Sequence, residues 1–392
     1  MTTFNTAPQK QIPFRANEWW FGKAMLMMGL VYFFVLWFDL SFSIFIQVVI
    51  PSLATIVGFA AFGYLVNDLF DRKADARANK KNTLQGKSPI YIASLFGAAL
   101  LFVFVPWLFL PSNKWIYILI GVELSLFLIY SIPPLRLKEK GLWGVGIDAL
   151  YAHALPAIIA GYTYVLIAKE EVAFEQFLIL FLWQFSAGAR NILMHQHDDK
   201  EADLIANTNT YIALEGIELK LLVKPLLIFE CFAALLLFGC LTNLNLVFGP
   251  ILLAFILATS FIAVIYAQRG LYSFLDSAWR HYPNVFYEKW MPILLLILLS
   301  FSDAYFLIVL FIHSVLFNLS YWEFIYQKSK AVYLSIPFAH VFLSLYTPIR
   351  ILISWIVNHI IFATFLLFGV NLKKENCSAM EYLKRKRNQQ NN

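Results

Sequence analysis

A row of oxygen-bearing side chains follows a long apolar run that ends near residue 66. The segment NDLFDRKADARANKKN, residues 67–82, contains Asn67, Asp68, Asp71 and Asp75. If the apolar run is a helix that continues into this segment, the three carboxylates stand at i, i+3 and i+7 and share one helix face. Like charges on one face repel each other, and a bound divalent cation removes that repulsion. The segment therefore predicts a metal site with oxygen ligands.

A second acidic segment, HDDKEAD, follows another long apolar run. Asp199 and Asp203 stand at i and i+4, and Asp198 and Glu201 lie beside them. Carboxylate oxygens suit Mg²⁺, whereas a zinc site would use cysteine or histidine ligands at matched spacing. A single acidic segment of this kind is usually a solvated loop. Two such segments, each after a long apolar run, favour Mg²⁺ ions that in turn bind phosphate oxygens.

Basic residues accompany both acidic segments. Lys80 and Lys81 follow the first segment, Arg136 and Lys138 lie in the segment SIPPLRLK, and Arg190 precedes Asp198 by about two helical turns. Lysine and arginine side chains bind the remaining oxygens of a metal-bound diphosphate through charge-assisted hydrogen bonds. Topology signals and lipid headgroup contacts are the alternative roles for such residues.

The elements that position these residues are expected to be membrane helices. Of the 392 residues, 60% are hydrophobic and 14% are charged, and the mean hydropathy is +0.68. Apolar runs of about 20 residues, long enough to cross a bilayer as a helix, recur along the chain. They lie at roughly 24–38, 44–66, 90–110, 115–132, 143–167, 174–194, 221–243, 247–268 and 290–313. We therefore predict an all-α integral membrane protein with a bundle of nine transmembrane helices.

The distribution of charge predicts the orientation of the bundle. Basic residues gather at 72–87, 136–140, 220–224 and 384–387, and such connections face the cytoplasm. Both acidic segments lie on that face, and the amino terminus is expected inside. Residues 1–313 form the predicted transmembrane domain, and residues 314–392 form a hydrophobic extension with one or two further apolar helices and a basic tail.

Three segments together resemble the UbiA superfamily of intramembrane prenyltransferases. GYLVNDLFDRKADARANKKN is similar to the first Asp-rich motif of the family, HDDKEADLIANTNTYIA to the second, and LIYSIPPLRLK to the segment between the fourth and fifth helices. The resemblance covers roughly residues 14 to 313. It implies nine helices around a central cavity that opens to lipid on one side and is capped by the cytoplasmic loops.

The resemblance also implies roles for individual residues. The metal ligands, for two Mg²⁺ ions, would be Asn67, Asp68, Asp71, Asp75, Asp199 and Asp203. The residues that bind the diphosphate would be Asn67, Lys81, Arg136, Lys138 and Arg190. We expect Asp71, Asp199 and Lys138 to be catalytic. The sequence departs from the family pattern at Lys81-Asn82, which replaces an Arg-Pro pair, at the histidines before the second motif, and in the long extension.

The expected reaction is Mg²⁺-dependent transfer of an isoprenyl group from a prenyl diphosphate to a lipophilic acceptor of the aromatic, quinone-precursor type. Aromatic residues such as Tyr64, Tyr130 and Tyr151 would shield the allylic cation, and Asp198, His197 or a water would take the acceptor proton. The expected partners are the prenyl donor, the acceptor and the bilayer, with no nucleic acid. The expected location is a plasma (inner) membrane, with the active site facing the cytoplasm.

Two other functions compete with this prediction. Some UbiA-like proteins transfer phosphoribose from a pyrophosphate sugar to polyprenyl phosphate, but the intact Asp199-x-x-x-Asp203 pattern favours a prenyl donor. An ion-coupled transporter would place its acidic residues near the bilayer midplane, whereas the two acidic segments lie at helix ends. A tetrapyrrole or a glycerol-type lipid is an alternative acceptor.

Overall fold

The described part of the chain is helical. The computed structural model describes residues 19–80, 82–215, 219–268 and 283–317, all of which belong to the compact unit Met1–Asn318. These residues form helices and turns without β-strands. The predicted domain boundary at 313 and the role of the extension stay predictions, because residues 318–392 lie outside the described residues.

Three kinds of helix occur in this unit. The α-helices are α2 (Met25–Trp37), α3 (Phe42–Arg77), α4 (Pro89–Phe104), α5 (Lys114–Ser131), α6 (Leu142–Ala149), α7 (Leu155–Ala168), α8 (Phe174–Asp198), α9 (Lys200–Ala206), α10 (Tyr211–Glu215), α11 (Leu219–Leu244), α12 (Gly249–Gln268), α14 (Met291–Ser302) and α15 (Phe306–Leu316). The π-helices are η2 (Trp20–Ala24), η5 (Leu150–Ala154) and η7 (Phe286–Trp290). The 3₁₀-helices are η3 (Val105–Leu108), η4 (Leu137–Glu139) and η6 (Leu246–Phe248).

Seven helices of the described residues are long and apolar enough to cross a membrane. They are Phe42–Arg77, Pro89–Leu108, Lys114–Ser131, Leu142–Ala168, Phe174–Asp198, Leu221–Leu244 and Pro283–Ser302. Three shorter apolar helices, Gly22–Trp37, Leu246–Thr259 and Phe306–Leu316, accompany them. The helical membrane fold is thus confirmed, whereas the predicted number of nine spans is not.

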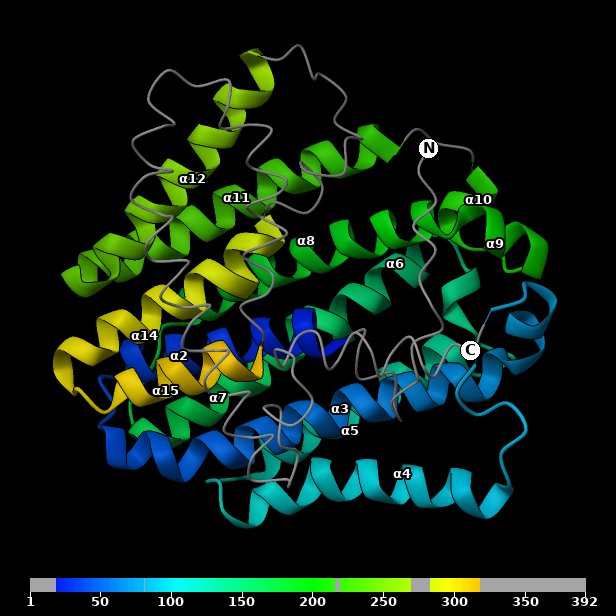
Figure 1. The fold of residues 1–392 in the computed structure, drawn as a ribbon, viewed down its shortest axis with the longest axis horizontal. Coiled ribbons are helices and arrows are strands. Elements are labelled where there is room, and N and C mark those ends of the chain that lie inside the picture. The colour runs from blue at the N-terminus through cyan, green and yellow to red at the C-terminus, as the bar shows by residue number, and fades with distance from the viewer. Residues whose placement is uncertain (1–18, 81, 216–218, 269–282, 318–392) are drawn as a thin grey trace, which may run out of the picture. The chain divides into compact units, whose positions relative to one another are not determined.

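The predicted ninth span, 290–313, is wrong as a single helix. Asp303 leaves the helical conformation, with φ −148° and ψ 117°, and its carboxylate accepts a hydrogen bond from the backbone N–H of Tyr305 at 3.0 Å. An aspartate side chain that accepts a hydrogen bond from the backbone two residues on forms a turn, and Phe306 closes this turn by donating its backbone N–H to the carbonyl of Asp303 at 3.1 Å. The chain therefore ends α14 and begins α15, which packs against α14 (Figure 1).

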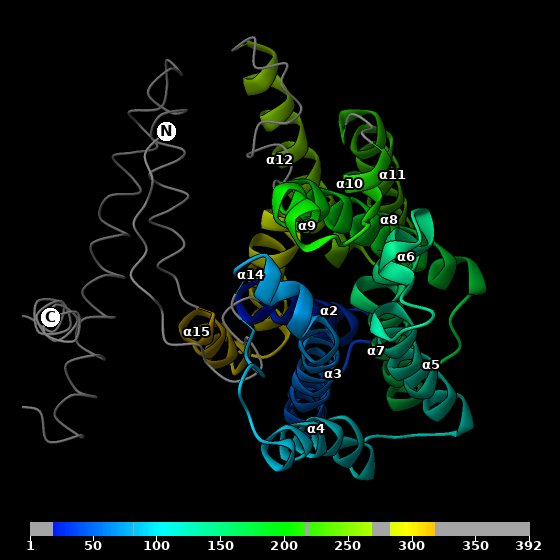
Figure 2. The same ribbon diagram turned by 90° about the vertical axis from the view of Figure 1, so that its right-hand side faces the viewer.

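Helix α2 lies at the centre of the described bundle. Every residue from Met25 to Leu36 is buried, as expected for a helix that is hydrophobic on all sides. Its neighbours are α3, α7 and α14, and Figure 2 shows α2 between them. On the other side of the bundle α8 packs against α11 and α6.

Helix α3 carries the first acidic motif beyond the apolar layer. Its 36 residues correspond to a length of about 54 Å at 1.5 Å per residue, which exceeds the hydrocarbon thickness of about 30 Å. Asp68, Asp71 and Asp75 all lie in this helix. The prediction that the apolar run continues as a helix through the motif is confirmed.

Candidate functional site

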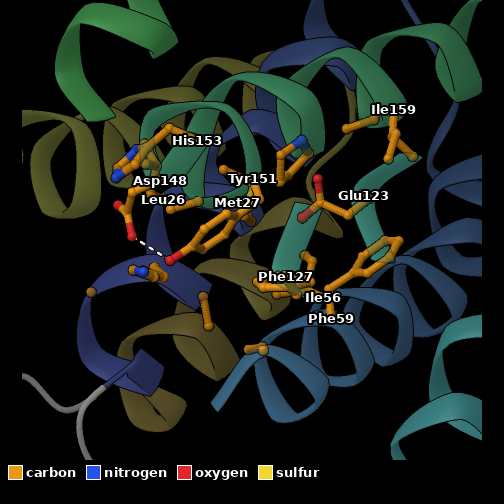
Figure 3. Close-up of a pocket in the computed structure, with 18 of the residues that line it drawn as sticks. Leu26, Met27, Ile56, Phe59, Glu123, Phe127, Asp148, Tyr151, His153 and Ile159 are labelled. Atoms are coloured by element: carbon orange, nitrogen blue, oxygen red, sulfur yellow. Dashed lines mark hydrogen bonds between the residues drawn. The ribbon is translucent and has the colours of Figure 1, made fainter. Parts of the chain in front are cut away.

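A central cavity of about 600 Å³ lies between α2, α3, α5, η5, α7 and α8. Asn67, Ser131, His195 and Asp198 line its polar end. Met27, Phe59, Trp107 and Ile159 are among the residues that line the remainder, and Figure 3 shows part of this lining. The cavity therefore connects the residues of the two acidic motifs with a mainly apolar interior.

Asp71 is held by two cations from the connection between α5 and α6. Arg136 donates a hydrogen bond from Nη2 to Oδ1 of Asp71 at 2.9 Å, and Lys138 Nζ donates to the other carboxylate oxygen, Oδ2. Lys138 also lies 3.4 Å from Oδ1 of Asn67. Burial lowers the pKa of Lys138, and the carboxylate of Asp71 opposes this effect. Four predicted site residues are therefore brought together by direct contacts.

The backbone of the connecting segment positions these cations. Arg136 has φ 36°, in the left-handed region, which residues other than glycine adopt at a cost. Its Nε donates to the carboxylate of Glu139 at 2.7 Å, which fixes the side chain from a second direction. A strained residue held by its neighbours is typical of functional sites.

The loop after α3 folds back on the first motif. Asn82 donates from Nδ2 to the Asp75 carboxylate and to the backbone carbonyl of Asp68, both at 2.7 Å. Thr83 donates to the carboxylate of Asp68 from its backbone N–H at 3.2 Å and from its hydroxyl at 2.5 Å. Asn82, a departure from the family pattern, is thus a partner of the motif.

Lys80 joins the two acidic motifs. Its Nζ lies 2.8 Å from Oδ2 of Asp199 and 3.7 Å from Oδ1 of Asp203. Burial alone would lower the pKa of Lys80, but the hydrogen bond to Asp199 and the nearby carboxylates outweigh burial and raise it. Asp203 also accepts a hydrogen bond from Thr210 at 3.0 Å, and burial raises its pKa. Lys81, the predicted diphosphate ligand, lies outside the described residues.

Arg190 takes part in a buried cluster. Its guanidinium donates to both carboxylate oxygens of Glu230, at 2.6 and 3.0 Å, and to Oδ1 of Asn284 at 2.6 Å. The side chains of Arg190 and Glu230 are both 0% exposed. These contacts show a structural ion pair that spacing in the sequence did not indicate. The predicted role of Arg190 in diphosphate binding stays a prediction.

Several of the predicted aromatic and proton-accepting residues line the cavity, whereas Trp183 packs in the core. Tyr64, Tyr130 and Tyr151 line the cavity, and the rings of Tyr130 and Tyr151 lie 5.2 Å apart. Asp198 lines the cavity as well. Trp183, another aromatic residue on these spans, packs its ring 5.4 Å from that of Phe238 in the core.

The donor set fits Mg²⁺ in chemistry, although the protein alone forms no closed metal cage. The candidate ligands are carboxylates and an amide, which Mg²⁺ prefers. In the part of the chain that the structure describes, no three acidic, histidine or cysteine side chains come close enough to hold a metal ion. Mg²⁺ is commonly bound by one or two carboxylates together with substrate phosphates, so this arrangement suits a metal that arrives with a diphosphate. The six predicted metal ligands stay predictions.

The chain is similar to one protein family and to several solved structures. The model of the UbiA prenyltransferase family matches residues 25–290, and no curated protein matches the chain. Among solved structures, a UbiA homologue from Archaeoglobus fulgidus bound to GPP and Mg²⁺ is 17% identical, with a TM-score of 0.49 over 71% of this chain and 96% of that chain. A structure described for digeranylgeranylglyceryl phosphate synthase is 17% identical, with a TM-score of 0.41 over 74% of this chain and 94% of that chain.

The family model spans more than half of the chain and includes both acidic motifs and the segment between α5 and α6. The helical membrane fold agrees with that match. The chain therefore belongs to the UbiA prenyltransferase family and is an integral, multi-pass membrane prenyltransferase.

Proposed function

We propose that the protein transfers an isoprenyl group from a prenyl diphosphate to a lipophilic aromatic acceptor, with Mg²⁺ and with release of diphosphate. The observation that carries the proposal is the set of ion pairs at the polar end of the cavity. Arg136 and Lys138 pair with Asp71 of α3, and Lys138 also contacts Asn67, which lines the cavity. Lys80 pairs with Asp199 in the turn between α8 and α9. A diphosphate at this end would leave its hydrocarbon chain in the apolar remainder of the cavity.

Two Mg²⁺ ions held by Asn67, Asp68, Asp71, Asp75, Asp199 and Asp203 would neutralise the charge that develops on the diphosphate. Arg136 and Lys138 supply the same stabilisation from the protein, because their donors already meet at Asp71. Such preorganised donors stabilise a departing anion without reorganisation during the reaction. We further assign Lys80 to the diphosphate, since it lies between the two motifs.

The proposed reaction breaks the allylic C–O bond, and the electron pair leaves with the diphosphate. Tyr130 and Tyr151, whose rings line the cavity, face the allylic cation and stabilise it through their π-electrons. The acceptor ring then forms a C–C bond to the allylic carbon and loses a proton. Asp198 is the proposed proton acceptor, because it lines the cavity beside this end.

The proposed orientation places this polar end at the cytoplasmic face of a plasma (inner) membrane. The basic residues of the connections between α3 and α4 and between α5 and α6 support it through the positive-inside rule. The aromatic nature of the acceptor is supported by the aromatic residues around the cavity, which stack on a planar ring.

The experiment measures diphosphate release by the purified full-length protein in detergent. Geranyl and geranylgeranyl diphosphate are offered with 4-hydroxybenzoate and 1,4-dihydroxy-2-naphthoate as aromatic acceptors, with and without Mg²⁺. We expect Mg²⁺-dependent release that falls by about 100-fold or more in Asp71→Asn and in Asp199→Asn. Asp39→Asn is the matched control, since Asp39 is an exposed aspartate beyond the opposite end of α3.

Two results would contradict the proposal. One is release that is independent of Mg²⁺ or unaffected in both motif variants. The other is turnover of a phosphoribosyl diphosphate with polyprenyl phosphate but of no prenyl diphosphate, which would assign the protein to glycosyl-type transfer.

A further inference from the structure

A carboxyl group lies in the middle of a membrane-spanning helix. Glu123 stands halfway along α5, which runs from Lys114 to Ser131. An ionisable residue at the centre of a bilayer is costly, and in membrane proteins such residues face the protein interior and serve function. The reaction proposed above takes place at the end of this helix and makes no use of Glu123.

Glu123 is buried without a partner. Its side chain is 0% exposed, and neither carboxylate oxygen has a hydrogen-bond partner. Lys23 lines the same cavity and its charge acts on Glu123 from a distance, but among the described residues the two side chains form neither a hydrogen bond nor an ion pair. An unpaired polar group in an apolar environment costs free energy, so the fold alone gives no reason for a glutamate here.

The carboxyl group is part of the cavity wall. Glu123 lines the cavity, and Figure 3 shows its carboxyl group turned towards the side on which Tyr151 and Asp148 lie. A second buried atom without a partner, Nδ1 of His153, belongs to the same lining. A prenyl chain is a hydrocarbon and satisfies neither group. A ligand that carries a polar group at this depth satisfies Glu123.

The helical register fixes where such a ligand would react. Glu123, Phe127, Tyr130 and Ser131 all line the cavity and stand at i, i+4, i+7 and i+8, on one face of α5. Tyr130 lies seven residues from Glu123 along α5, which corresponds to about 10 Å at 1.5 Å per residue. A ligand that contacts Glu123 and presents a carbon beside Tyr130 is therefore an extended molecule of about that length.

We propose that Glu123 is the recognition residue for the second substrate, an extended lipophilic molecule that donates a hydrogen bond from a hydroxyl or N–H group to this carboxyl in the middle of the bilayer. The inference rests on the proposed function only in that it calls this molecule the prenyl acceptor. According to this inference, the hydroxyl or N–H group of the acceptor contributes to binding in addition to its aromatic ring.

The test is a binding experiment that needs neither Mg²⁺ nor turnover. The probes are 4-nonylphenol and 4-nonylanisole, which differ by methylation of the hydroxyl group, and their affinities follow from the rise in unfolding temperature in phosphatidylcholine nanodiscs. We expect the wild-type protein to bind the phenol about tenfold more tightly than its methyl ether, the usual effect of one hydrogen bond to a buried group. In Glu123→Leu this ratio is expected to fall to about one.

Two further variants separate recognition from folding. Glu123→Gln keeps an oxygen that accepts a hydrogen bond, so it should keep most of the preference for the phenol. Ser125→Leu places the same leucine on the exposed side of α5 and should leave the preference unchanged. Without a probe, Glu123→Leu should unfold at the same or a higher temperature than the wild type, because it removes a buried polar group that has no partner.

Three results would overturn the assignment of Glu123. The first is equal affinity of the wild type for both probes, or binding of neither probe. The second is a preference for the phenol that persists in Glu123→Leu. The third is an unfolding temperature of Glu123→Leu below that of the wild type. The third result would show that the Glu123 carboxyl group stabilises the fold. Loss of Mg²⁺-dependent diphosphate release by the wild type would instead contradict the proposed function and leave the binding result to stand by itself.

Discussion

Lys138 and Lys80 make similar ion pairs in very different surroundings, and substitution by methionine distinguishes them. Lys138 and its partner Asp71 have side chains that are 7% and 10% exposed, whereas Lys80 and Asp199 are 34% and 37% exposed. Methionine keeps most of the apolar volume of lysine and removes the charge. Each substitution therefore leaves a carboxylate without its lysine partner. The Asp71 carboxylate is nearly inaccessible to solvent, whereas the Asp199 carboxylate is well solvated.

The expected losses of stability follow from this difference. Removing one partner of a buried ion pair costs about 3–5 kcal/mol, because the other charge is left uncompensated. Lys138→Met should lie at the lower end, about 3 kcal/mol, because Arg136 still contacts Asp71 at 2.9 Å. An exposed pair contributes about 0–1 kcal/mol because water screens it. Lys80→Met should therefore lower the free energy of unfolding by less than about 1 kcal/mol.

The expected effect on catalysis differs from the effect on stability. A preorganised donor to a developing anion contributes about 2.7–4 kcal/mol to the transition state. In Lys138→Met, kcat for diphosphate release should therefore fall by about 10²–10³-fold. Lys138→Arg keeps the charge and should lose less. Lys140→Met is the control, because Lys140 is an exposed lysine in the same connection.

The assay combines unfolding in detergent with initial rates of diphosphate release at saturating prenyl diphosphate, measured at a temperature at which every variant is folded. The reasoning fails if Lys80→Met destabilises the protein as much as Lys138→Met does. It also fails if folded Lys138→Met keeps kcat within about fivefold of the wild type, since that is less than half of the expected effect in free energy.

Three further predictions concern the metal, the buried ion pair and close helix packing. Chelation should abolish diphosphate release, and added Mg²⁺ should restore it. Mg²⁺ alone should raise the unfolding temperature less than Mg²⁺ with diphosphate does. Equal rises in unfolding temperature would indicate that the protein alone supplies a complete set of metal ligands. Arg190→Met should destabilise the protein by about 3–5 kcal/mol, and Glu230→Gln in the same chain should recover part of it, as a double-mutant cycle of unfolding would reveal. Gly188→Ala should cost about 1–3 kcal/mol in the same measurement, because its Cβ would lie 2.8 Å from the Cα of Ala149; a neutral result would contradict the packing argument.

Local spacing was sufficient to predict the helix that carries the first motif. Asp68, Asp71 and Asp75 lie in α3 as their i, i+3 and i+7 spacing indicates. The membrane class and the family followed from apolar runs and from motifs that are short and contiguous. These properties depend on neighbours along the chain, so a single sequence contains them.

The contact between Lys80 and Asp199 depends on how α3 ends. Asn79 adopts φ 52°, a left-handed conformation that commonly terminates helices, and the chain turns there. Lys80 consequently reaches Asp199 on another element. The direction of a side chain just after a helix end is determined by the three-dimensional turn, which spacing along the chain does not specify. The partner of Arg190 was unpredictable for a similar reason, since Glu230 is 40 residues away along the chain.

The polar residues deep in the cavity depend on irregular helices that apolar runs conceal. Lys23, His153 and Glu288 lie in the π-helices η2, η5 and η7, and all three line the cavity. A π-turn inserts an extra residue and shifts the face that the following side chains present. Within uniformly apolar segments such as these, a one-residue shift leaves the hydropathy pattern nearly unchanged. The helix that carries the first motif is therefore encoded in local spacing, whereas the cavity interior, where we propose that the acceptor binds, is determined by how α2, α5 and α7 pack.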